Sequence, residues 1–130
     1  RDHEGLEQLL RKEPFDFVQF TYNVEDREVE ERLLPLAADR GIATLINRPF
    51  QRGGLFRKVK GVPLPDWSSE FDCHSWGQYF IKFIAAHPAV TCVIPATSKV
   101  RHMQDNMAAG FGRLPSVTMR KRMLAHYVSL

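Results

Sequence analysis

The sequence contains few cysteines, and neither stands in a pattern that binds metal or builds a disulfide framework. Only Cys73 and Cys92 occur among the 130 residues. Two cysteines without paired His or Cys spacing predict no metal site and no disulfide-stapled fold. Cys92 lies within the apolar run AVTCVIP, so we expect a small buried residue. Cys73 precedes His74, but adjacent residues seldom hold each other at hydrogen-bonding distance, so we do not expect a thiolate nucleophile.

The sequence also lacks an apolar run long enough to span a bilayer, and its first segment, RDHEGLEQLLRKEP, is too polar for a signal peptide. We therefore expect a cytoplasmic protein with no membrane partner. No initiator methionine opens the chain, so we expect the true start, and any targeting signal, to lie upstream. The composition is 44% hydrophobic and 25% charged, which is typical of a globular domain with a core.

Acidic residues are absent from one segment, 48–60, which carries five basic residues. The net charge of +3 is therefore unevenly spread, with a second basic group at 120–122. A solvated face is the usual meaning of such a run. Here, however, Gly53 and Gly54 free the backbone to approach a ligand, and arginines beside them would neutralise a phosphate. Nucleic acid is not expected as a partner, because interleaved exposed aromatics and a recognised motif are both missing.

Helical spacing of apolar residues alternates with short runs rich in aromatic and β-branched residues. Strands are expected at 15–22, 42–49 and 89–95, and helices at 3–13, 24–41, 75–88, 99–110 and 115–130. Pro35 should kink or weaken the second helix, and residues 57–74 should form a loop. The expected core faces are two helical stripes, Val29, Leu33, Leu36 and Ala37, then Trp76, Phe80, Phe83, Ile84 and His87. The alternation predicts an α/β fold whose parallel strands are joined by right-handed crossovers.

The segment VIPATSKVRHMQDN, residues 93–106, passes from a strand through small residues directly into a helix. The first turn of a helix has unpaired N–H groups and a partial positive charge, which suits a phosphate. Thr97 and Ser98 can cap this helix and also donate hydroxyl hydrogen bonds. A plain helix cap after a buried strand is the simpler alternative. The other two strands also end in polar segments, TYN and NRPFQRGG, and the carboxyl ends of parallel strands share one rim. Three such segments favour a ligand site.

The segments DFVQFTYN, LLPLAADRGIATLINRPFQRGGLF and AVTCVIPATSKVRHMQDNMAAGFGRLP resemble, in order and spacing, the second half of an aldo-keto reductase. This resemblance implies that residues 1–130 form the C-terminal half of a (β/α)8 TIM barrel, supplying its sixth, seventh and eighth strands. It implies NADPH as the cofactor, with NADH possible, lying over the rim at the carboxyl ends of the strands. Residues 115–130 would form the C-terminal helix of this half-barrel.

The resemblance assigns cofactor-binding roles along the rim. Gln19 would hydrogen-bond the nicotinamide carboxamide, as an amide can, and Asn106 would pair with adenine. The loop after the seventh strand would lie along the pyrophosphate, with Pro49, Phe50, Gly53, Gly54 and Leu55, while Asn47 and Arg48, just before it, would lie near the nicotinamide. The segment after the eighth strand would hold the adenosine, its ribose and its 2′-phosphate, with Thr97, Ser98, Lys99, His102, Asp105 and Asn106.

Two positions depart from the family pattern. Where many relatives stack an aromatic ring on the nicotinamide, this chain has Asn47, so Arg48 or Phe50 would have to cover the ring. Where many relatives set a Lys or Arg against the 2′-phosphate, the matching residues are Ala96 and His102, although basic residues lie nearby.

No catalytic residue is expected in this chain. The family's tetrad of Asp, Tyr, Lys and His lies on the first four strands, and Tyr22 matches none of its members. The chain is therefore expected to be the cofactor-binding part of a reductase of small carbonyl compounds. The alternative is a non-catalytic half-barrel that binds a nucleotide or a protein. Three strands leave two open sheet edges, so we expect either a missing N-terminal half-barrel or self-association.

Overall fold

The computed structural model describes residues 2–130 and contains one parallel three-stranded sheet. The strands are β1 (Phe17–Thr21), β2 (Ala43–Asn47) and β3 (Cys92–Val93), in the spatial order β1-β2-β3. Gln19 lies opposite Leu45, which in turn lies opposite Cys92. Both strand pairs are parallel, so the predicted α/β fold with three parallel strands is confirmed.

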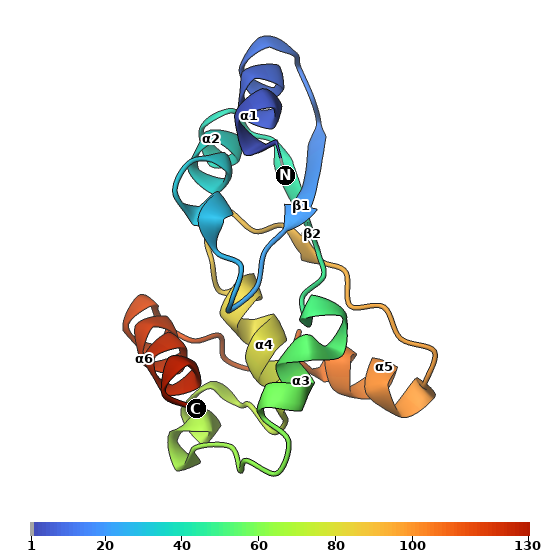
Figure 1. The fold of residues 1–130 in the computed structure, drawn as a ribbon, viewed down its shortest axis with the longest axis vertical. Helices are drawn as coiled ribbons and strands as arrows, with labels where there is room; N and C mark the ends of the chain where they lie inside the picture. Colours follow the sequence, from blue (N-terminus) through green and yellow to red (C-terminus); the bar gives the residue numbers. More distant parts are fainter. Residues whose placement is uncertain (1) are drawn as a thin grey trace.

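The helices alternate with the strands along the chain (Figure 1). The α-helices are α1 (His3–Lys12), α2 (Leu33–Asp39), α3 (Gly54–Lys58), α4 (Trp76–Ala85), α5 (Val100–Ala108) and α6 (Val117–Ser129). Three short 3₁₀ segments lie between them, η1 (Glu28–Glu30), η2 (Gln51–Gly53) and η3 (Asp66–Phe71). Within residues 2–130, no helix combines the length and the apolar character that a bilayer crossing would need.

One face of the sheet is buried under helices and the other is open. Val18, Phe20 and Ile46 point to the covered face and belong to the hydrophobic core. Gln19 and Cys92 point to the opposite face and are exposed. Successive side chains of a strand point to opposite faces, so this pattern follows from the strand geometry. In both predicted stripes most residues are confirmed as buried core, although Trp76 and His87 are only partly buried.

The helix predicted at 24–41 is wrong in its first half. The segment forms η1 and then α2, which begins only at Leu33. Pro35 therefore sits in the first turn of α2 rather than in a helix interior. The first N–H groups of a helix have no intrahelical acceptor, so proline removes no hydrogen bond there and the expected kink does not occur.

The loop predicted at 57–74 and the strand predicted at 89–95 are also corrected. The loop contains the end of α3 and all of η3, and the strand has only two paired residues. Before β3 the side chain of Thr44 replaces backbone pairing. Its hydroxyl donates to the Ala89 carbonyl at 2.7 Å and accepts from the Thr91 N–H at 3.0 Å.

The prediction that Cys92 is buried is wrong, because its side chain is exposed on the open face of the sheet. The apolar residues around Cys92 predicted a strand that is buried on both faces, as strands of parallel sheets normally are. Cys73 is buried instead, and this burial raises the pKa of its thiol to about 11. A thiol with so high a pKa is protonated near neutral pH, which agrees with the expectation that it is no nucleophile.

Buried polar contacts fasten α6 to the rest of the fold. Arg120 forms an ion pair with Glu30 at 3.1 Å, and its Nε donates to the Phe83 carbonyl at 2.9 Å. The hydroxyl of Tyr22 donates to the same Glu30 carboxylate. The hydroxyl of Tyr79 donates to the Met123 carbonyl at 2.7 Å. The C-terminal helix is thereby tied to α4 and to the segment that follows β1.

His87 should make the fold less stable in mild acid. Its Nδ1 accepts the Ala89 N–H at 3.1 Å, and burial, together with nearby Arg120, lowers its pKa below 6.5. As the pH falls below about 6.5, the unfolded chain binds a proton before the folded chain does. The free energy of unfolding should therefore decrease through this range, as urea titrations at pH 7.5 to 5 would measure.

The variant His87→Gln should lack this part of the pH dependence, whereas His74→Gln, at an exposed histidine, should retain it. Asp72 and Glu7 have pKa values lowered by arginine partners, and their contributions are lost only below about pH 4.5. An unchanged slope in His87→Gln would show that another group causes the acid sensitivity.

Candidate functional site

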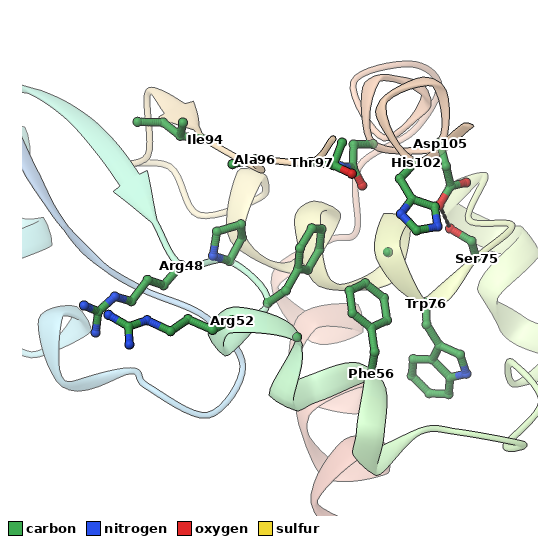
Figure 2. Close-up of a pocket in the computed structure, with 15 residues that line it drawn as sticks. Arg48, Arg52, Phe56, Ser75, Trp76, Ile94, Ala96, Thr97, His102 and Asp105 are labelled. Atoms are coloured by element: carbon green, nitrogen blue, oxygen red, sulfur yellow. Dashed lines mark hydrogen bonds between the residues drawn. The ribbon is translucent and has the colours of Figure 1, made fainter. Parts of the chain in front are cut away.

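A cavity of about 760 Å³ lies beyond the carboxyl ends of β2 and β3 (Figure 2). Its walls come from the loop after β2 with α3, from the start of α4, and from α5 together with the segment that joins β3 to it. The lining residues are Arg48, Pro49, Phe50, Arg52, Gly53, Phe56, Ser75, Trp76, Gly77, Ile94, Ala96, Thr97, His102, Asp105 and Asn106. Its volume falls in the range typical of sites for small molecules and cofactors, about 300–1,000 Å³.

The loop after β2 has an unusual backbone. Arg48, Gln51 and Arg52 have positive φ values of 50°, 48° and 54°, and Gly53 follows at 85°. Residues other than glycine are strained in this left-handed region, and such strain tends to occur at functional sites. Buried Asn23, two residues after β1, supports the loop, because its Nδ2 donates to the Arg48 carbonyl at 3.0 Å. The loop thus holds two arginines at one end of the cavity (Figure 2).

Aromatic rings form the apolar wall. The rings of Phe50 and Phe56 are 4.8 Å apart, and Phe56 in turn packs against Phe80 of α4 at 5.7 Å. Trp76 is fixed at the start of α4 because its indole N–H donates to the Val62 carbonyl at 2.8 Å. An apolar wall with a few polar groups is the usual construction of a site that binds planar rings.

The third wall carries Thr97, His102 and Asn106. The expectation that Thr97 or Ser98 caps α5 is wrong, because Lys99 is the N-cap residue and its side chain makes no capping hydrogen bond. Thr97 Oγ1 instead accepts the Lys99 N–H at 3.2 Å, one residue before the helix. A short polar side chain can bond its own backbone two residues on, and this local turn competes with a cap.

Asp105 and Asn106 differ in what their side chains contact. The Asp105 carboxylate accepts the Ser75 hydroxyl at 2.6 Å and the Gln78 Nε2 at 2.8 Å. The Asn106 side chain lines the cavity beside Gly77, and its Oδ1 is 3.6 Å from the point where a Cβ of residue 77 would stand. Asp105 therefore ties α5 to α4, while Asn106 offers an amide to the cavity.

The structure brings together some of the predicted site residues and not others. Those that line the cavity are Arg48, Pro49, Phe50, Gly53, Thr97, His102, Asp105 and Asn106. Gln19 is exposed on the open face of the sheet, outside the cavity lining. Asn47 accepts the Thr21 hydroxyl at 2.7 Å, and Leu55 is fully buried in the core. Gly54 begins α3, while Ser98 and Lys99 are exposed before α5.

The set of residues predicted to bind the cofactor omitted seven that line the cavity, although Ala96 had been matched to the 2′-phosphate position. They are Arg52, Phe56, Ser75, Trp76, Gly77, Ile94 and Ala96. Arg52 had a usable signal, because it stands beside Gly53 in the basic segment. Trp76 belongs to an aromatic stripe in which Phe80, Phe83 and Ile84 are core, so its pattern concealed its position at the cavity. Ser75 and Gly77 carry no local signal, since a contact with α5 across about thirty residues sets their role.

Within residues 2–130, no group of three or more His, Cys, Asp or Glu side chains is placed to hold a metal ion. The cavity lining offers a ligand two arginine cations, aromatic rings and the side-chain amide of Asn106. These groups together suit an anionic molecule that also carries planar rings.

Comparisons with known proteins agree on one family. A family model described as the aldo/keto reductase family matches residues 1–121. The fold is similar to that of aldo-keto reductase AKR11C1 from Bacillus halodurans in its holo form, with a TM-score of 0.71, 17% identity, and coverage of 95% of this chain and 46% of that one. It is also similar to a thermostable aldo-keto reductase, Tm1743, in complex with the inhibitor epalrestat, with a TM-score of 0.70, 23% identity, and coverage of 96% and 45%.

The chain thus spans less than half the length of the solved structures that it matches. The comparison with curated protein sequences gave no match. At such low identities the structural likeness supports the fold, and the family rests on the model match.

Replacing Arg52 with glycine should stabilise the fold. The Arg52 φ of 54° is strained for a residue with a Cβ, and glycine adopts it freely, so Arg52→Gly should raise the free energy of unfolding by about 1 kcal/mol. Arg57→Gly is the matched control, because Arg57 lies inside α3, where glycine should cost about 1 kcal/mol. Denaturant titration measures both. A loss of stability in both variants would show that the loop is not strained at Arg52.

Proposed function

Because this chain belongs to the aldo/keto reductase family, we propose that it is the cofactor-binding part of an NAD(P)H-dependent reductase of small carbonyl compounds. The observation that carries the proposal is the cavity at the carboxyl ends of β2 and β3. Its lining combines two arginines, an aromatic wall and the side-chain amide of Asn106. A dinucleotide cofactor offers the complementary groups, namely phosphates, planar rings and the hydrogen-bonding edge of adenine.

The residues present fit such a cofactor. Arg48 and Arg52 would bind the phosphates, for which the planar guanidinium is well suited. Asn106 would pair with adenine, because an amide can donate and accept on one ring edge. Gly53 has open space where a Cβ would stand, so the loop leaves room for a ligand close to the backbone. Gln19, on the open sheet face, would receive the nicotinamide carboxamide.

When bound, a nicotinamide cofactor supplies a hydride to a carbonyl carbon. This chain's residues would bind and orient the dinucleotide and exclude water from it, while the proton donor would come from strands outside this chain. Tyr22 does not qualify as that donor. Its hydroxyl donates to Glu30, and burial raises its pKa far above the range of a general acid.

NADPH is the preferred cofactor in this proposal, with NADH as the alternative. His102 lines the end of the cavity that would hold the adenosine. Lys99, the residue just before α5, and Arg101, in the first turn of α5, are exposed nearby. These groups would favour an additional phosphate on the ribose. Ala96, which also lines the cavity, contributes no charge to that preference.

We further propose that a first half-barrel covers the open face of the sheet. Phe17 on β1 is 62% exposed, and on the other flank Val100, Met107 and Phe111 are between 60% and 74% exposed. Apolar side chains on both flanks, with unpaired edges at β1 and β3, indicate a partner that continues the sheet on both sides. The matched structures are more than twice as long as this chain, which is room for five further strands.

The cofactor proposal predicts a specific loss for Asn106→Ala. Removing the amide that would pair with adenine should weaken NADPH binding by about 1–3 kcal/mol. Gln104→Ala on the same helix is the control, because Gln104 is exposed and outside the cavity lining. Isothermal titration of the protein that contains the chain would measure both. An unchanged affinity in Asn106→Ala would remove this residue from the site.

The proposed first half-barrel predicts protection of Cys92. In the protein that contains this chain, a closed barrel would shield Cys92 from a thiol reagent, although its side chain is exposed in the present structure. Cys73 should also react slowly, since it is buried and its pKa is about 11. Labelling followed by mass spectrometry measures both rates, and urea should equalise them. Fast labelling of Cys92 alone would favour a half-barrel module without the missing strands.

A further inference from the structure

Helix α5 receives little guidance from the strand that precedes it. β3 has two residues, and the helix begins after the turn at residues 94–99 without a capping side chain. Such a connection leaves the helix free to shift, unless contacts elsewhere hold it. The contacts that hold α5 come from α4.

The first contact is a polar clamp at the start of α4. The Asp105 carboxylate accepts one hydrogen bond on each oxygen, from the Ser75 hydroxyl at 2.6 Å and from the Gln78 amide at 2.8 Å. These two donors are themselves fixed. The Ser75 oxygen caps α4 by accepting the Gln78 N–H at 3.0 Å, and Gln78 Oε1 accepts the His74 N–H at 2.9 Å. We call Ser75, Gln78 and Asp105 the α4–α5 clamp.

Gly77 gives the clamp its room. A Cβ at residue 77 would stand 3.0 Å from Asp105 Oδ2, tighter than an ordinary van der Waals contact. The absence of a side chain lets the carboxylate approach the first turn of α4, where the helix dipole favours negative charge. This supports the clamp through a second physical effect besides its hydrogen bonds.

The loop that follows α5 is held by the same helix. Buried Lys82 donates from Nζ to the carbonyls of Phe111 and Arg113, each at 2.8 Å. The Arg113 side chain in turn pairs with Asp72, just before α4. Contacts from Asp105 within α5 and from the loop after it therefore fix α5 against α4, with Asn106 directly beside the clamp.

We propose that Asp105 is a positioning residue, which acts through Ser75 and Gln78 to set α5 so that the Asn106 amide faces the cavity. This inference rests on the proposed function and refines the role of Asp105 within it. Each carboxylate oxygen already accepts one hydrogen bond within the clamp, so in this inference Asp105 serves the ligand through Asn106 rather than by binding adenine itself.

A mutant cycle tests the inference with adenosine 2′,5′-bisphosphate as the probe, in the protein that contains the chain. Asp105→Ala should weaken binding roughly tenfold, the scale of one hydrogen bond to a charged group. In a Ser75→Ala, Gln78→Met background, the same substitution should cause no further loss, because the partners are already gone. Another tenfold loss in that background would mean that Asp105 contacts the ligand directly, which overturns the inference.

Two further variants guard against a trivial loss of fold. Gly77→Ala should weaken binding as Asp105→Ala does, because the added methyl group would crowd the carboxylate. Asp105→Asn should give a smaller loss than Asp105→Ala, because its side-chain oxygen still accepts one hydrogen bond while its nitrogen accepts none. Gln104→Ala should bind like the wild type. If Asp105→Ala binds as tightly as the wild type, the clamp does not position Asn106.

Hydrogen exchange without ligand separates this inference from the proposed function. The amides of α5 should exchange faster in Asp105→Ala than in the wild type, while those of α1 should not change. If the wild type does not bind the probe, the proposed function fails, and the exchange of α5 still decides whether the clamp exists. Equal exchange of α5 in both proteins would overturn the inference.

Discussion

The packing of α4 is the interaction on which the other parts of the structure depend. Phe80, Phe83 and Ile84 on this helix are almost completely buried in the core beneath the sheet. Polar atoms of the same helix then reach outward in three directions. Its first turn holds α5, Lys82 holds the loop after α5, and Tyr79 holds α6. A helix that is apolar toward the sheet and polar toward its neighbours can position several elements at once, because its own place is set by hydrophobic burial.

The cavity illustrates how this scaffold supports a site. Its apolar wall continues the aromatic core, through Phe56 against Phe80, so it inherits the rigidity of the core. Its charged end lies on a strained loop that Asn23 supports from the segment after β1. Strain at Arg48 and Arg52 costs stability, and the surrounding structure offsets it. A ligand that binds both arginines would bind more tightly as a result, because the loop is already held in its binding conformation and need not be ordered on binding.

The alternation of strands and helices, and most of the core, could be predicted from the sequence. Stripes such as Val29, Leu33 and Leu36 follow the helical period. These residues are buried as predicted, even though the helix begins later than expected. The eight predicted residues that do line the cavity lie on two continuous segments beside strand ends. What could not be predicted depends on distant contacts. The role of Gly77 requires Asp105, and the exposure of Cys92 requires knowing that one face of the sheet is uncovered.

The hydroxyl of Thr44 joins the second strand to the segment before the third, by donating to Ala89 and accepting from Thr91. Because the hydroxyl both donates and accepts, position 44 requires a hydroxyl group, and side-chain volume alone does not express this requirement. Valine has nearly the same shape as threonine but can neither donate nor accept there, and it would leave the Ala89 carbonyl and the Thr91 N–H without this partner. Serine keeps the chemistry while losing a methyl group. A substitution scale built on volume alone would therefore rank the two replacements in the wrong order at Thr44.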